Sequence, residues 1–276
     1  MISIPVEEIQ KYKDLARGTR RDILDMIYKT KSPHIGGCFS MVELLIALYF
    51  RILSINPKEP NDPNRDRFIL SKGHGCPALY VVLAKRGFID QNTLAGFARN
   101  KGTLEQHPTR SLLRGIEVSS GSLGHGLSLG VGMALAAKYD KKDYKIFVFL
   151  GDGELHEGSN WEAMMLASHH KLDNLIAIVD YNKLQAMGKG EEIIDLDPLR
   201  EKWLSFSWAV KEIDGHNFEE IINALEAIPF QFQKPTCIIA NTIKGKGVSF
   251  MENEIIWHDK CPDEKEYKEA LKEIFK

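Results

Sequence analysis

The chain has 276 residues and a formal net charge of −2, with 43% hydrophobic and 27% charged residues. This balance is typical of a globular protein and offers no charge excess for binding nucleic acid or an anionic membrane. No apolar run approaches the ~18 residues of a membrane span, and the first residues are acidic where a secretion signal is basic. We therefore expect a cytoplasmic protein with no nucleic-acid or membrane partner.

The first part of the chain predicts helices around one short strand. In chain order, the patterns predict a helix over 7–30, a helix from a Ser40–Glu43 capping box to Phe50, a strand over 67–70, a helix over 76–86, and another helix starting near Asp90. Residues 99–121 show no period and predict a long loop, a feature that is often functional in compact domains.

The second part of the chain alternates between strands and helices. After a glycine-rich turn and a small-residue helix within 121–138, the patterns predict strands over 145–151, 174–182, 208–213 and 236–242, and helices over 158–170, 218–228 and 263–276. Apolar strands separated by helices indicate an α/β fold with an open, mainly parallel sheet and helices on both faces. We expect one domain over 1–276, with an N-terminal helical extension.

Polar residues follow two of the predicted strands directly. Gly151-Asp152-Gly153 ends one buried strand, and Asn182 ends the next. Ligands of open parallel sheets bind beyond the carboxyl ends of the strands, so Asp152 and Asn182 should be neighbours in space. Their oxygens suit Mg²⁺ or Ca²⁺, with diphosphate oxygens completing the coordination. Gly153 allows a phosphate to approach the backbone, and the following helix can direct amides at it.

The segment from Gly151 to Asn182 resembles the thiamine-diphosphate signature, which is a GDG, a spacer of similar length and a terminal Asn. The resemblance implies thiamine diphosphate as the cofactor. It also implies that Asp152, Asn182 and the carbonyl of Leu184 hold the metal, and that Gly153 contacts the cofactor.

Five further segments resemble those of the transketolase family and occur in the family's order. They are the segments 32–37, 71–75, 105–108, 121–126, and 244–247 with 257–258. Each segment is weak evidence singly, but five in order with the metal motif are specific. The chain is therefore similar to the N-terminal, diphosphate-binding part of a transketolase, and the resemblance implies the thiamine-diphosphate-binding fold.

The resemblance gives four histidines a role. It implies that His34 and His258 lie near the substrate carbonyl and hydroxyls, that His107 binds the donor's C1 hydroxyl, and that His74 and His258 lie against the diphosphate. Imidazole suits this chemistry because it exchanges protons near neutral pH. The remaining histidines are expected to be surface or hydrogen-bonded residues: His125, His156, His169, His170 and His216.

Two other sites follow from the same resemblance. The glycine turn with Gly121, Ser122 and Leu123 is expected to contact the cofactor. Glu157 resembles a glutamate that lies at the family's dimer interface and links two active sites. Its alternative is an ordinary acidic residue in the first turn of a helix, where the helix dipole favours it.

The resemblance also implies a second chain. A transketolase has pyrimidine-binding and C-terminal domains, which this sequence lacks and which we expect on a separate C-terminal subunit in an α₂β₂ assembly. The expected activity is Mg²⁺- and thiamine-diphosphate-dependent transfer of a two-carbon ketol unit from a ketose phosphate to an aldose phosphate.

Three alternatives stay open. A 1-deoxyxylulose-5-phosphate synthase shares the early histidines and the metal motif, although it normally carries all domains on one chain. A 2-oxo acid dehydrogenase subunit is also a split cofactor-binding chain, but the histidine series argues against it. A non-catalytic paralogue that only binds a partner is the third.

Overall fold

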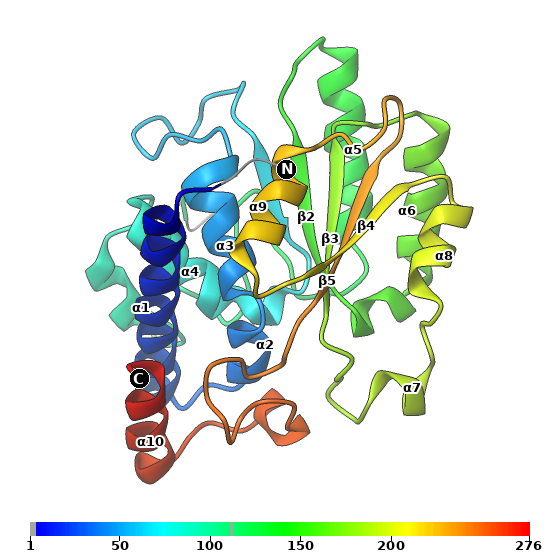
Figure 1. Ribbon diagram of the computed structural model, residues 1–276. Coiled ribbons are helices and arrows are strands. Elements are labelled where there is room, and N and C mark those ends of the chain that lie inside the picture. The colour runs from blue at the N-terminus through cyan, green and yellow to red at the C-terminus, as the bar shows by residue number, and fades with distance from the viewer. Residues whose placement is uncertain (1–3, 111–112) are drawn as a thin grey trace.

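The computed structural model describes residues 4–110 and 113–276. Its centre is a sheet of five parallel strands in the order β1-β2-β3-β5-β4 (Figure 1). The strands are β1 (Arg67–Leu70), β2 (Ile146–Gly151), β3 (Leu175–Tyr181), β4 (Ala209–Asp214) and β5 (Thr236–Asn241). The predicted parallel sheet is confirmed, and every predicted strand is present within one residue at each end.

Both faces of the sheet are buried because side chains alternate along each strand. In β2, Phe147 and Phe149 belong to one hydrophobic core, whereas Ile146 and Val148 belong to the other. All four side chains are buried. This two-sided burial explains why the strands read as continuous apolar runs rather than as alternating patterns.

Helices form a layer on each face (Figure 1). The core on one face includes residues of α1 (Val6–Thr30), α2 (Ile35–Phe39), α3 (Val42–Ala47), α4 (Cys76–Arg86), α9 (Phe218–Glu226) and α10 (Glu264–Ile274). The core on the other face includes residues of α5 (Gly126–Tyr139), α6 (Gly158–His169) and α8 (Leu199–Ser205). Helices on both faces confirm the predicted fold class.

The predicted helix from Ser40 to Phe50 is wrong in its start and its continuity. Ser40 lies between α2 and α3, and its hydroxyl donates to Asp180 Oδ2 at 2.6 Å rather than capping a helix. Glu43 accepts a bidentate pair of hydrogen bonds from Arg20 instead of closing a capping box. The spacing of these two residues serves buried polar contacts, and the chain continues from α3 into a π-helical turn over Leu48–Ile52.

Smaller differences concern short elements. The helix expected near Asp90 is a 3-10 helix over Gln91–Gly96, and α8 and α7 (Gly190–Ile193) were not predicted. The predicted loop over 99–121 has no helix or strand where the structure describes it, and residues 111–112 lie outside that description. Within the described ranges, no helix has the length and apolar character that a bilayer span requires.

Candidate active site

A cavity of about 390 Å³ opens at the carboxyl ends of β1, β2, β3 and β5. Its lining combines residues from the loops that follow these strands with residues from two distant loops: His34, Gly37, Lys72, His74, His107, Gly121, Leu123, Gly151, Asp152, Gly153, Glu154, Asn182, Leu184, Gln185, Ala186, Lys244 and His258. A larger cavity of about 570 Å³ shares residues 182–185, but its lining includes no histidine. We assign the site to the smaller cavity because it gathers the groups that can exchange protons.

The three predicted metal ligands lie together in this cavity. Asp152 accepts hydrogen bonds from the amides of Gly153, at 2.7 Å, and Lys183, at 2.6 Å. Asn182 Oδ1 accepts from the Leu184 amide at 3.1 Å, so the turn that carries both residues is fixed. Carboxylate, amide and carbonyl oxygens are the donor set that Mg²⁺ prefers, and the residues therefore fit this ion.

Asp152 is 5% exposed, which makes its negative charge costly. Burial, and secondarily the carboxylate of Asp180, raise the pKa of Asp152 to about 6. A bound cation would remove this cost, because it places a compensating positive charge against the carboxylate.

Three of the predicted histidines form a compact group. The ring centroids lie 5.2 Å apart for His34 and His74, 5.4 Å for His34 and His258, and 5.6 Å for His74 and His258. His34 has a left-handed backbone with φ 76°, and its amide donates to the His258 carbonyl at 2.9 Å. His107 approaches from the long loop and lies against Gly121. The cavity thus brings all four predicted histidines together.

The environment keeps these imidazoles neutral. Burial lowers the pKa of His34 and His74, and burial together with the Lys244 ammonium lowers that of His258 to about 4. Neutral rings can donate through one nitrogen and accept through the other, as contact with sugar hydroxyls requires.

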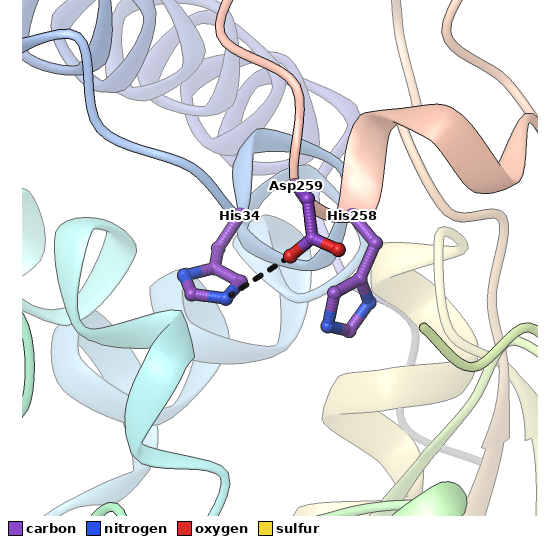
Figure 2. Close-up of side chains that lie close together, drawn as sticks. All are labelled: His34, His258 and Asp259. Carbon is purple, nitrogen blue, oxygen red and sulfur yellow. Dashed lines mark ion pairs between the residues drawn. The ribbon is translucent and has the colours of Figure 1, made fainter. Parts of the chain in front are cut away.

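Figure 2 shows His34, His258 and Asp259 facing one another at the edge of this cluster. One ligand atom from each of these residues lies within 4.8 Å of the others, with His34 Nε2 3.9 Å from Asp259 Oδ1. The Lys244 ammonium lies 2.8 Å from His258 Nδ1. Because this cation disfavours a metal ion beside it, the trio is better suited to hydrogen bonding than to metal coordination.

Two buried lysines were missed by the sequence analysis. Lys72 pairs with Asp180 at 2.6 Å, with both side chains almost fully buried. Lys244 Nζ donates to the Leu184 carbonyl at 3.0 Å, and burial followed by repulsion from Lys72 lowers its pKa to about 8. Both lysines stand inside segments that resemble the family's, beside the glycines and histidines that carry the resemblance. Two cations in one cavity favour an anionic ligand such as a diphosphate.

The glycine turn lies against the cavity, although not all of its predicted residues line it. Gly121 and Leu123 are lining residues, whereas Ser122 is exposed and is not. Gly124 has φ +84°, and a Cβ there would lie 2.5 Å from the Glu157 Cβ. Only glycine fits this close approach.

Glu157 is exposed at the start of α6 and does not line the cavity. The structure therefore places it away from the histidine cluster. Two other histidines show the expected hydrogen bonding: His216 lies 3.0 Å from Glu43, and His125 lies 3.1 Å from the Leu123 carbonyl.

Comparison with known proteins identifies what this chain is similar to. The family model for "Transketolase, thiamine diphosphate binding domain" matches residues 12–275. One of the two subunits of the apulose-4-phosphate transketolase from Phocaeicola vulgatus is 46% identical over 255 residues, which cover 92% of this chain and 90% of that relative. The 6-deoxy-6-sulfo-D-fructose transketolase subunit of a Clostridium species is 45% identical over 257 residues, 93% of this chain and 94% of that relative.

A solved structure shows the same fold in a longer chain. Transketolase from Campylobacter jejuni superposes with a TM-score of 0.90 at 32% identity. The match covers 99% of this chain and 43% of that one.

Proposed function

The chain belongs to the transketolase family, and we propose that it is the N-terminal subunit of a two-chain transketolase. In this proposal the assembled enzyme transfers a two-carbon ketol unit from a ketose phosphate to an aldose phosphate, in the cytoplasm. The observation that carries the proposal is the single cavity in which four histidines meet an all-oxygen metal-ligand set and two buried lysines.

The cofactor-binding residues follow from the cavity's chemistry. Asp152, Asn182 and the Leu184 carbonyl would hold Mg²⁺. Gly153 would contact the diphosphate, and Lys244 stands beside it as a counter-charge. The glycine turn, through Gly121 and Leu123 with Ser122 at its edge, and His74 would complete the enclosure, all within the lining except for Ser122.

When bound, thiamine diphosphate supplies the electron sink for breaking and forming the bond beside a ketose carbonyl. The chain's own contribution is to orient the sugar and to handle protons. Lys244 donates to His258 Nδ1, so the neutral His258 ring carries its proton on Nε2 and can donate it to a substrate oxygen. His34 and His107 are placed for the substrate hydroxyls, in accordance with their positions around the same cavity.

The partner subunit is supported by the outer surface of α5 and α6. These adjoining helices lack a polar face, and Leu129, Met165 and Leu166 are 43%, 55% and 45% exposed. A helix that is apolar all round is normally buried, so this surface suits a contact with another chain. The two relatives compared above are named as transketolase subunits, and this chain spans 43% of the single-chain enzyme from Campylobacter jejuni. We propose an α₂β₂ assembly with a C-terminal transketolase subunit, in which Glu157 lies near the interface.

A reconstitution assay tests the proposal. The chain is mixed with its candidate C-terminal subunit, Mg²⁺ and thiamine diphosphate, and aldose release from a series of ketose phosphates is followed. We expect turnover only in the mixture, and His107→Ala should raise KM for the donor or lower kcat. Unchanged donor kinetics in His107→Ala would remove its assigned contact, and carbon dioxide release from pyruvate would favour a synthase or dehydrogenase instead.

A further inference from the structure

Glu154, the residue after Gly-Asp-Gly, is buried to 2% exposure although glutamate is rarely buried without partners. Its carboxylate has three. Oε1 accepts from the Gly124 amide at 2.9 Å and from the Ser71 hydroxyl, and Oε2 accepts from the Gly151 amide at 3.2 Å. Three donors on one carboxylate stabilise its ionised form inside the protein.

These donors come from three separate loops around the cavity. Ser71 begins the loop after β1, Gly124 belongs to the glycine turn before α5, and Gly151 ends β2. Ser71 Oγ also accepts from the amide of Gly126 at 3.1 Å, which adds a second link between the first two loops. The three loops carry different parts of the candidate cofactor site, so their relative positions decide whether the site is complete.

The backbone itself does not join these loops side to side. Their close approach instead depends on glycine: a Cβ at Gly73 would lie 2.7 Å from the Gly121 amide, and one at Gly126 would lie 2.2 Å from Ser71 Oγ. Glycine permits the approach but contributes no attraction. The hydrogen bonds of Glu154 supply that attraction at the point where all three loops meet.

We propose that Glu154 is a positioning residue that holds the three cofactor loops together and thereby sets the affinity for thiamine diphosphate. The inference rests on the proposed function, because it assumes that these loops enclose that cofactor. Both carboxylate oxygens are occupied by loop donors, so Glu154 acts through the loops and not on the reacting atoms. Charge alone would oppose this placement, since a carboxylate repels a diphosphate.

Repulsion and positioning predict opposite effects of Glu154→Gln. Removing the charge would tighten cofactor binding if repulsion were the main influence. If positioning dominates, binding weakens, because glutamine offers one acceptor oxygen and turns an NH₂ group toward an amide that needs an acceptor. Glu154→Asp keeps the charge but is one methylene too short to reach all three loops, so it should not restore affinity.

The test is calorimetric titration of thiamine diphosphate with Mg²⁺ into the reconstituted two-chain complex. We expect Glu154→Gln and Glu154→Asp to weaken binding at least about tenfold, the loss of one charge-assisted hydrogen bond, with kcat at saturating cofactor within about threefold of the parent. Glu269→Gln, on the exposed side of α10, is the matched control and should leave both quantities unchanged.

Ser71→Ala removes one donor without touching the carboxylate and serves if the Glu154 variants do not assemble. It should weaken binding several-fold, and it should add little in a Glu154→Gln background because the two residues share one contact. Equal or tighter cofactor binding in Glu154→Gln, or in Ser71→Ala where that variant stands in, overturns the proposal. A hundredfold lower kcat with unchanged affinity would overturn it as well, by placing Glu154 on the reacting atoms. If the parent complex itself binds no thiamine diphosphate, the proposed function fails instead.

Discussion

Replacing Asp152 with asparagine should stabilise the metal-free protein while abolishing its stabilisation by Mg²⁺ and thiamine diphosphate. The folded protein raises the pKa of this carboxyl from 3.8 to about 6 through burial and the nearby Asp180. A group whose pKa is raised on folding binds its proton more tightly in the folded state. The metal-free protein therefore loses stability as the pH rises from about 4 through about 6.

The size of this loss follows from the shift. About two pKa units correspond to about 3 kcal/mol of unfolding free energy, lost once the pH exceeds about 6. Asparagine avoids this loss but retains only one acceptor oxygen, so the amide of Gly153 or Lys183 loses its partner at a cost of about 1 kcal/mol. We expect a net gain of about 1–2 kcal/mol for Asp152→Asn above pH 7.

Urea unfolding of the purified chain, with a chelator present, measures this directly. At pH 8 the variant should be the more stable protein, and near pH 4 the advantage should vanish because the parent carboxyl is protonated. In the two-chain complex, Mg²⁺ and thiamine diphosphate should raise the melting temperature of the parent but not of the variant. A metal-free variant less stable than the parent at pH 8, or equal stabilisation of both by metal and cofactor, would contradict this explanation.

Three further predictions follow from the same site. Asp180→Asn leaves the Lys72 ammonium buried without its carboxylate and should cost about 3–5 kcal/mol in urea unfolding, whereas a cost below about 1 kcal/mol would contradict a coupled buried pair. Lys244, whose pKa is lowered to about 8 in the cavity, should take up a proton when the diphosphate binds at pH 8.5. Calorimetry in buffers of different ionisation enthalpy measures that uptake, and the same uptake in Lys244→Met would assign it elsewhere. Gly124→Ala places a Cβ 2.5 Å from a neighbouring side-chain carbon and should weaken cofactor binding at least about tenfold, while Gly132→Ala, where a Cβ meets open space, should not lower thermal stability; equal effects of the two would argue against the close approach.

The fold was predictable because each strand is buried on both faces and bounded by turn residues. A run such as residues 145–151 has one good interpretation in a chain that alternates strands with helices. The start of the helix after Ser40 was not predictable in the same way. Ser40 and Glu43 have the spacing of a capping box, but their partners are Asp180 and Arg20, which only the tertiary structure brings near.

The site divides along the same line. Residues inside a recognisable segment, such as Asp152 and His74, were found because their neighbours in sequence carry the signal. Glu154 and Lys244 were missed as functional groups, because their importance lies in partners from other loops. Exposure also cannot be judged from a motif, and Ser122 and Glu157 lie outside the cavity although their segments resemble the family's.

On our proposal, this chain provides half of a cofactor site that a second subunit completes. Calorimetric titration of thiamine diphosphate with Mg²⁺, into the chain alone and into the chain mixed with its candidate C-terminal subunit, tests this division of the site. We predict tight, metal-dependent binding in the mixture only. Absence of binding in both samples, with the chain folded and the two subunits shown to associate, would contradict the proposal and leave a non-catalytic partner-binding protein as the better description.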